Sequence, residues 1–231
     1  MLLGTSLLST IAIAEDGSSS NWYIKSEAGA AFSNDAGTTD MSFTHGPQVT
    51  VNDSDLGVSP VFGIGIGRQI YKNFRGDVTF NYRGGFELDT ESTDSLPASP
   101  LDADIKSYSL MANLYWDIYR FDAGQLAITP YLSGGAGVAI NQTDDMLLIA
   151  GGTNAAEISG GTKTNFAFQV GAGAGIEMSE HLTLDLGYRY VDLGEFQSGK
   201  NLPSVPSVKL NDPIKGDLTS HEIMIGLRYN F

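Results

Sequence analysis

The residues of this chain that could do hydrolytic chemistry are few. The sequence has 231 residues, three histidines and no cysteine, which excludes disulfides, zinc-thiolate sites and thiol catalysis. Ser220 and His221 are adjacent near one end of an alternating segment, where a lipid hydrolase is conceivable. Because neighbouring strand residues point to opposite faces, no direct hydrogen bond could join them. No nucleophile-elbow sequence is present, so we expect no enzyme activity, catalytic residue, cofactor or metal site.

Charged residues at every second position could instead form ion pairs inside the protein. They lie opposite apolar residues and nearly balance, with five basic members, Lys25, Arg75, Arg83, Arg189 and Arg228, against six acidic ones, Glu27, Asp77, Asp117, Glu177, Asp185 and Glu222. Near-neutrality suits the inside of a narrow barrel, because unpaired charge in a confined space of low dielectric constant is costly. We predict a lumen charge network formed by Lys25, Glu27, Arg75, Asp77, Asp117, Glu177, Asp185, Arg189, Glu222 and Arg228.

The last fourteen residues give the clearest view of the elements that must position these charges. In Leu218 to Phe231, one side carries Ser220, Glu222, Met224, Gly226, Arg228 and Asn230, and the other carries His221, Ile223, Ile225, Leu227, Tyr229 and Phe231. A period of two residues predicts a β-strand with one apolar and one polar face. In a soluble protein the apolar face would be buried, whereas in a membrane barrel it would meet lipid.

The same alternation recurs along the chain and predicts eight strands, at residues 22–33, 59–70, 74–88, 105–121, 126–140, 164–178, 182–196 and 218–231. The connections between them alternate between long and short. Brief periplasmic turns and long outer loops are typical of up-and-down barrels in bacterial outer membranes. The sequence therefore predicts an all-β fold, an eight-stranded antiparallel up-and-down transmembrane β-barrel with short periplasmic turns and four long extracellular loops.

The interior of such a barrel is only just wide enough to be filled by its own side chains. The glycines of the segments 59–70, 126–140 and 164–178 should make room for the Arg and Tyr side chains of the others. Pro130 cannot donate a hydrogen bond to a neighbouring strand and suggests a bulge. On the apolar side, we expect an aromatic girdle at the membrane surfaces, formed by Trp22, Trp116, Tyr188, Tyr190, Tyr229 and Phe231.

The N-terminus and the overall charge bear on location and partners. Residues 1–14 resemble the hydrophobic and cleavage regions of a signal peptide, without the usual positive first region. We expect a truncated signal peptide at 1–14, a barrel domain at 15–231 and export to the outer membrane. The formal net charge of −14 argues against nucleic-acid binding, which needs clustered Lys and Arg. The first two long loops hold nine acidic residues and no basic one, so they could attract divalent cations or basic partners.

Three stretches carry a family resemblance. The C-terminal strand ending in Phe231 looks like the assembly signal of outer-membrane barrels, with Ile223, Ile225, Leu227, Tyr229 and Phe231 as its residues. The opening WYIKSEAGAAFS and the later GYRYVDLG at 187–194 resemble the opacity-protein-like and outer membrane immunogenic protein families. The resemblance implies an eight-stranded, porin-like surface antigen with variable loops and carries over no catalytic residue.

These expectations lead to one preferred function and several alternatives. The preferred hypothesis is a non-enzymatic surface protein whose barrel anchors exposed loops for envelope integrity or for contact with surfaces or host molecules. Its partners would be outer-membrane lipid and lipopolysaccharide, with the barrel assembly machinery binding the C-terminal strand. The alternatives are a small-solute porin, an outer-leaflet lipid-modifying enzyme and a soluble lipocalin-like ligand carrier, which would need the apolar faces turned inward.

Overall fold

The protein forms a single closed β-barrel of eight long strands. The computed structural model describes residues 21–33, 39–42, 48–55, 57–87, 89–91, 101–102, 104–124, 126–150, 153–203 and 210–231. The barrel strands are β1 (Trp22–Phe32), β4 (Val58–Tyr71), β5 (Phe74–Glu87), β8 (Asp104–Asp117), β10 (Leu126–Thr143), β13 (Gly161–Glu177), β14 (Leu182–Gln197) and β15 (Lys215–Asn230). All neighbours pair antiparallel, and β10 pairs with β13 to close the ring. The predicted fold class is confirmed. None of the described residues forms a helix long and apolar enough to cross a bilayer.

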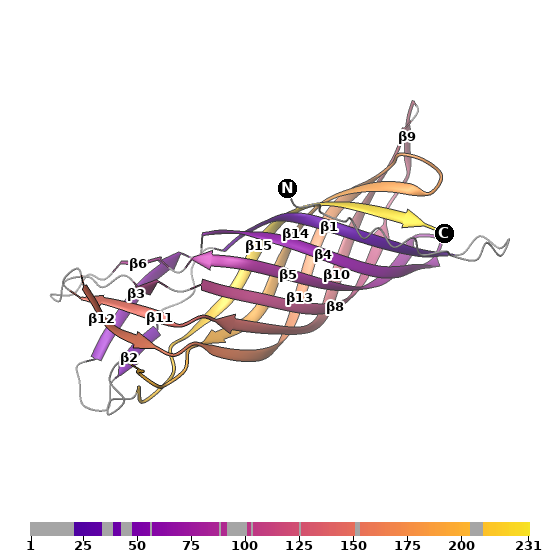
Figure 1. Ribbon diagram of the computed structural model, residues 1–231. Coiled ribbons are helices and arrows are strands. Elements are labelled where there is room, and N and C mark those ends of the chain that lie inside the picture. The colour runs from indigo at the N-terminus through magenta and orange to yellow at the C-terminus, as the bar shows by residue number, and fades with distance from the viewer. Residues whose placement is uncertain are drawn as a thin grey trace, which may run out of the picture.

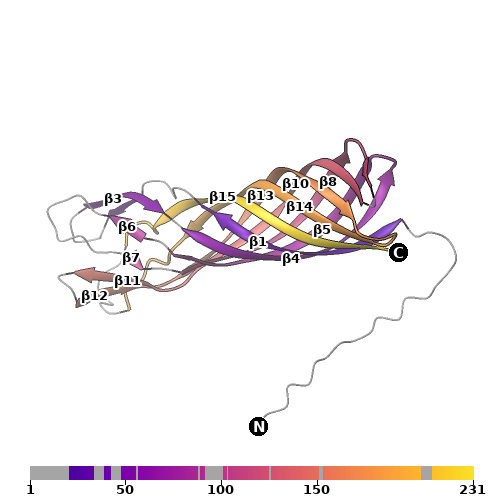
Figure 2. The same ribbon diagram turned by 90° about the horizontal axis from the view of Figure 1, so that it is seen from above.

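The two ends of the barrel differ in length and structure. One end, the turn end, holds the start of β1, the end of β15 and short connections, together with the short strand β9 (Phe121–Ala123) (Figures 1 and 2). At the other end, the loop end, six short strands form two three-stranded sheets: β2 (Thr39–Ser42), β3 (Gln48–Asp55), β6 (Asp89–Glu91), β7 (Leu101–Asp102), β11 (Met146–Ala150) and β12 (Thr153–Ile158). The hairpin of β11 and β12 lies in the third long loop and leaves the barrel with eight strands.

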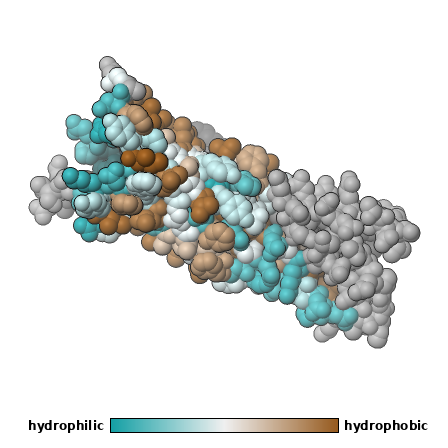
Figure 3. Space-filling view, turned by 180° about the vertical axis from the view of Figure 1, so that it is seen from behind, coloured by the Kyte–Doolittle hydropathy of each residue, from teal (hydrophilic) through white to brown (hydrophobic). Residues whose placement is uncertain are grey.

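The apolar faces of the strands point outward, as the sequence predicts. Ile64 and Ile225 are 65% and 52% exposed, whereas Arg189 and Glu222 are 7% and 0% exposed. Apolar side chains are spread over the outer wall of the barrel, and hydrophilic ones gather at the turn end and beside the loop end (Figure 3). Trp22, Trp116, Tyr188 and Tyr229 also point outward. A soluble carrier with the apolar faces inside is therefore excluded.

Toward the loop end the same strands reverse this pattern. Ile105 is fully buried inside β8, while Asp104 is exposed on the outer face of the same strand. Sixteen residues at about 3.3 Å each, tilted by about 40°, rise roughly 40 Å, whereas the apolar band of such barrels is about 25 Å tall. The outer portion of the barrel is thus built like a soluble protein. We call its interior the apolar plug; its fully buried members include Phe86, Ile105, Met146, Ile158, Leu193 and Leu218.

Two β-bulges mark the level at which the reversal begins. The β5–β8 register shifts between Arg83 and Phe86, and the β14–β15 register shifts between Asp192 and Glu195. Each bulge contains a glycine with positive φ, Gly85 at 76° and Gly194 at 70°. A bulge inserts a residue and changes the direction of the side chains that follow. Phe86 and Phe196 consequently turn inward, where both are buried.

The two bulge glycines provide a matched pair of substitutions. A Cβ on Gly194 would collide with the side chain of Asn165, whereas a Cβ on Gly85 would meet no atom within 4 Å. Both positions need the left-handed backbone that costs other residues about 1–2 kcal/mol. We expect Gly85→Ala to lower the free energy of unfolding by that amount and Gly194→Ala to lower it further. Urea unfolding of the two variants measures the difference, and equal losses would contradict the collision.

Pro130 does not form the bulge predicted from the sequence. Its carbonyl oxygen accepts a hydrogen bond from the backbone N–H of Ile118, but proline has no N–H to complete the pair. The ladder between β8 and β10 therefore ends at Asp117 and Tyr131, with no register shift. This also corrects the predicted strand 105–121: β8 stops at Asp117, and the chain returns as β9 to pair with Leu126–Ile128 of β10.

Candidate functional site

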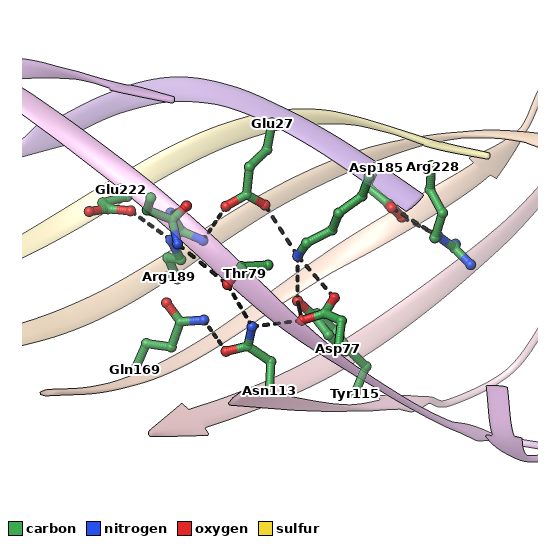
Figure 4. A network of polar contacts seen from close by, with 12 residues as sticks. Glu27, Asp77, Thr79, Asn113, Tyr115, Gln169, Asp185, Arg189, Glu222 and Arg228 are labelled. Atoms are coloured by element: carbon green, nitrogen blue, oxygen red, sulfur yellow. Dashed lines mark hydrogen bonds and ion pairs between the residues drawn. The ribbon is translucent and has the colours of Figure 1, made fainter. Parts of the chain in front are cut away.

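The polar interior of the barrel begins below the apolar plug with a carboxylate held by two arginines. Glu222 on β15 is fully buried and accepts hydrogen bonds from Arg83 Nε and Arg189 Nε, each at 2.6 Å. Ser220 donates to the same carboxylate at 3.1 Å. Arg189 Nη1 also bonds Glu27 at 2.7 Å. Strands far apart in the sequence are joined across the lumen at this level (Figure 4).

Lys25 extends this network toward the turn end. Its Nζ lies 3.3 Å from Glu27 and 3.1 Å from Asp77, and it donates to Tyr115 Oη at 2.7 Å. Asp77 accepts a further hydrogen bond from Asn113 at 2.7 Å (Figure 4). Ion pairs and hydrogen bonds thus connect Asp77 to Glu222 without a break, so each buried charge has an opposite partner, as burial requires.

Two separate ion pairs lie nearest the turn end. Arg75 Nε is 3.2 Å from Asp117, and Arg228 Nε is 3.1 Å from Asp185. The guanidinium of Arg75 also lies 4.0 Å from the ring centre of Tyr115 and 4.8 Å from that of Tyr131. Cation–π contacts of this kind hold a buried guanidinium in place.

Glycines on the inward faces leave the space that these large side chains occupy. A Cβ on Gly67 of β4 would overlap the ring of Tyr23. A Cβ on Gly173 of β13 would come within 2.5 Å of Tyr131 Oη. The glycine-rich strands therefore face the Tyr and Arg side chains of other strands, in the arrangement expected from the sequence.

Nine of the ten residues of the predicted network lie in the lumen and pair there. The tenth, Glu177, lies at the rim of the turn end, where Arg120 Nη2 contacts it at 2.9 Å and its side chain is 37% exposed. The prediction for Glu177 is therefore wrong, because this residue is the last of β13 and lies outside the enclosed lumen. Arg83, which the sequence analysis counts among the alternating charges but leaves out of the ten-residue network, is fully buried and central to it. Its place was readable from the spacing Arg75, Asp77, Thr79, Asn81, Arg83 on β5.

Uncharged side chains also belong to the network, and the sequence analysis did not select them. Asn113 donates to Asp77 and to Thr79, at 2.7 and 2.9 Å, and accepts from Gln169 at 2.6 Å. Arg83 Nη1 donates to Ser109 at 2.9 Å. The sequence marks these residues only by their place at every second position, on the inward face of a strand. Among the described residues, no three His, Cys, Asp or Glu side chains are grouped as a metal ion would require.

The residues of the predicted assembly signal lie on the outer face of the last strand. Ile223, Ile225, Leu227 and Tyr229 of β15 are 45–60% exposed. Phe231 follows the strand and donates its backbone N–H to Trp22 O at 3.1 Å. The residues of the predicted signal thus lie on the outer wall of the barrel, on the strand that pairs with β1.

Comparison with known proteins identifies this architecture. A family model described as "Outer membrane protein beta-barrel domain" matches residues 1–231. The chain belongs to this family. It is an outer-membrane β-barrel of Gram-negative type, so the turn end faces the periplasm and the loop end is extracellular.

Individual matches agree with the family. "Outer membrane protein PagN" of Salmonella typhimurium is 26% identical over 180 residues, which cover 73% of this chain and 72% of the relative. A Rickettsia bellii protein named "Putative adhesin" is 26% identical over 98% of this chain and 94% of its own length. The solved outer membrane protein OprG from Pseudomonas aeruginosa matches with a TM-score of 0.60 and 18% identity, over 93% of this chain and 98% of that chain. The last match shows the shared fold.

The extracellular part of this outer-membrane barrel carries an ion pair that can be titrated. Lys163 on β13 donates to Glu195 on β14, and this contact holds the pKa of the Glu195 carboxyl below its ordinary value. Lys215 is a weaker cause of the same shift. Because the folded pKa is depressed, the pair stabilises the fold above the ordinary pKa of the carboxyl and stops doing so as the pH falls through the folded pKa.

We expect an NMR titration of the Glu195 side-chain carboxyl to show this shift directly. Lys163→Met should raise the pKa of Glu195 toward its ordinary value, and Lys215→Met should raise it less. A Glu195 titration unchanged by Lys163→Met would contradict the pairing.

Proposed function

We propose that this chain is a non-enzymatic surface protein whose barrel holds a rigid extracellular platform for contact with other surfaces or host molecules. The observation that carries this proposal is the length of the strands, which continue past the apolar band into a part with its own apolar interior. A barrel serving only as an anchor would not need this second core. The relatives named "Putative adhesin" support the same role.

The segment after β14 covers this platform. The backbone of Ser198 donates to Ile214 O at 2.8 Å, and that of Gly199 donates to Ser159 O at 2.7 Å. Leu202, Leu210 and Ile214 are at most 5% exposed and belong to the apolar plug. The described parts of the fourth long loop therefore pack on the third, which supports a fixed surface at the extracellular end.

Exchange of the loops tests this function. Bacteria carrying the protein should bind host cells or extracellular matrix more than bacteria without it. A variant in which residues 198–214 are replaced by a short linker should lose that binding while still reaching the outer membrane. The matched control replaces the short turn 72–73 at the periplasmic end. Binding that survives the loop exchange, or is lost with the turn exchange, would refute the proposal.

A porin is the main alternative, and the apolar plug argues against it. Ile105, Leu193 and Leu218 fill the path above the charged network with no exposed surface. Hydrated ions would have to cross this mainly apolar layer, where the loss of their water is costly. We expect no steady ohmic openings from purified protein in a planar bilayer; such openings would establish the porin.

A lipid-modifying enzyme finds little support at Ser220 and His221. Ser220 points into the lumen toward Glu222, whereas His221 points outward, with Nδ1 2.6 Å from Tyr188 Oη. The two side chains are thus on opposite sides of the wall. Unchanged lipid A acylation in cells overproducing the protein is the result we expect.

The remaining roles concern export, assembly and the envelope. We propose that residues 1–14 act as a signal peptide before a barrel domain at 15–231; the leader lies outside the described residues, as do Asp35 and Asp94 of the acidic loops. The C-terminal strand would bind the barrel assembly machinery through its outward apolar residues, and the outer face would contact lipopolysaccharide. Deletion of Phe231 should reduce the folded, heat-modifiable form in outer membranes, and normal amounts would refute the assembly role.

A further inference from the structure

One arginine of β4 points away from the lumen, into the lipid-facing wall of the barrel. Arg68 is exposed and lies on the same face of the strand as Ile66 and Ile70. Ile70, which is 63% exposed, is one step nearer the periplasmic end, so apolar side chains lie on both sides of this arginine. A charge in such a wall is costly unless its long side chain reaches an opposite charge at the membrane surface.

The described part of the chain supplies no such charge to Arg68. No ion pair within the described residues includes this side chain. Trp22, its partner on β1, lies with its ring centre 5.9 Å from the guanidinium. Gly76, its partner on β5, has no side chain, and a Cβ there would come within 3.0 Å of Ile70 Cδ1. The cross-strand neighbours of Arg68 are thus an aromatic ring and a glycine, and the guanidinium can take an anion from outside the protein.

A groove in the outer wall begins directly beside this arginine and runs toward the middle of the membrane. Its volume is about 590 Å³, and apolar side chains form most of its lining. The next two outward pairs of β1 and β4 belong to it, Ile24 with Ile66 and Ser26 with Ile64. Ser26 lies between the larger side chains of Ile64 and Leu227, so the groove is deepest along β1. A flexible hydrocarbon chain fits such a lining.

We propose that this part of the wall binds a phospholipid of the periplasmic leaflet whose headgroup has a net negative charge. Its phosphate accepts hydrogen bonds from the Arg68 guanidinium, whose fork matches two phosphate oxygens, and one acyl chain lies in the groove. The indole of Trp22 sits at the level of the headgroup, where tryptophan is enriched in membrane proteins. The basic group is nearer the periplasm and the groove leads from it toward the bilayer centre, in the order of headgroup and chain in that leaflet.

Charge and position exclude the other occupants of the same groove. A second copy of the chain packed by two-fold symmetry on this wall would bring another Arg68 to the same depth, and the two like charges would repel each other. Lipopolysaccharide carries its phosphates at the extracellular surface, at the opposite end of the wall. A free phosphate ion would leave the groove unused. An anionic phospholipid supplies both the negative charge and the chain.

The two tryptophans of the chain allow a direct test, because only Trp22 lies in the proposed site. Trp116 faces lipid on β8, beside Phe74 and Leu132. Trp116→Phe therefore leaves a reporter of the site, and Trp22→Phe leaves a matched reporter of ordinary wall. In vesicles of phosphatidylcholine, bromine-labelled phosphatidylglycerol should quench Trp22 with an apparent affinity about fivefold above that of phosphatidylcholine with the same labelled chains, the factor for one basic side chain at the surface. Trp116 should show no preference.

Two arginine substitutions in the W116F protein test the headgroup contact. Arg68→Gln should abolish the preference of Trp22 for phosphatidylglycerol. Arg120→Gln removes an exposed arginine at the same end, one that is paired with Glu177, and should leave the preference unchanged. Equal quenching of Trp22 by the two lipids, a preference that survives R68Q, or a Trp22 shielded from both lipids by another protein chain would each overturn the proposal.

A ring placed in the groove tests the acyl chain. Ser26→Phe fills the groove without touching Arg68, and Ala136→Phe adds the same ring at an exposed outward position on β10. Both variants should keep the folded, heat-modifiable form on gels, because both side chains face lipid. S26F should lose most of the preference for phosphatidylglycerol, whereas A136F should keep it. An unchanged preference in S26F, or an equal loss in A136F, would show that no lipid chain occupies this groove.

The outcome does not depend on the role of the extracellular platform, since the two surfaces lie at opposite ends of the barrel.

Discussion

Replacing Glu222 with glutamine is expected to lower the free energy of unfolding by about 3–5 kcal/mol, the cost of removing one partner from a buried ion pair. The carboxylate has no exposed surface and accepts hydrogen bonds from both Arg83 and Arg189. Glutamine has the same shape but no charge, and its amide nitrogen would face a guanidinium that cannot accept. The lumen would then hold one uncompensated positive charge. Equilibrium urea unfolding in phospholipid vesicles, followed by tryptophan fluorescence, measures the loss.

The chain offers a matched control for this substitution. Glu177 also pairs with an arginine, Arg120, but at the periplasmic rim, where both side chains are more than a third exposed. Exposed pairs contribute about 0–1 kcal/mol, so Glu177→Gln should change stability little. Adding Arg83→Met to E222Q should recover part of the loss, because it removes the guanidinium that had paired with Glu222, whereas Arg189 still pairs with Glu27. Similar losses in E222Q and E177Q would show that the network is not sealed from water.

The barrel and the orientation of its faces could be predicted from the sequence because both depend on a local period. Phe62, Ile64 and Ile66 alternate with glycines on β4, and this pattern alone fixes which side is large and apolar. Near-neutral charge on the opposite faces then indicated a closed lumen. The exact pairs could not be predicted, because Arg83 meets Glu222 across 139 residues through the curvature and register of the whole barrel.

The extracellular core was missed for a physical reason. Outside the bilayer the solvent is water, so the apolar residues must turn inward, yet alternation along a strand looks the same in both environments. On β8, Ile105 shares the inward parity of Ser107 and Ser109, and one apolar residue at an inward position gave little sign of a second core. The bulges at Gly85 and Gly194 change the phase, and each adds only one residue to a strand. A single glycine in a glycine-rich barrel sequence gives little warning of this.

The interior also depends on side chains without charge, which charge balance cannot reveal. Gln169 and Asn113 are ordinary polar residues at inward positions in the sequence, but their amides extend the hydrogen bonds of Asp77 across to β13. Glu177 was predicted to lie in the network because it falls on the inward face of β13, but it is the last residue of that strand and lies at the rim. Whether an inward charge is buried depends on its depth along the barrel axis. The alternation of a strand shows which face a residue occupies and not how deep it lies.

An arginine introduced at Ile64 is expected to lower the free energy of unfolding by about 2–4 kcal/mol, the cost of a basic side chain at the middle of the lipid-facing wall. Ile64 is 65% exposed and lies opposite Ser26, about halfway along the paired region of β1 and β4. Its side chain has few protein contacts to lose, so the cost would come from hydrocarbon around the new charge. Urea unfolding in vesicles measures it.

Thr162 provides the control that separates lipid from packing. It is exposed on the outer face of β13 beside Gln142, close to the start of this strand at the loop end, where we expect water to surround it. Thr162→Arg should therefore change stability by no more than about 0.5 kcal/mol. If water surrounded both positions, the two arginines would lower the free energy of unfolding by similar amounts. Unequal losses are therefore expected only if lipid surrounds Ile64. Equal losses at both positions would mean that the apolar band does not lie where the exposed isoleucines place it, and the boundary between the lipid-facing wall and the extracellular platform would have to move with it.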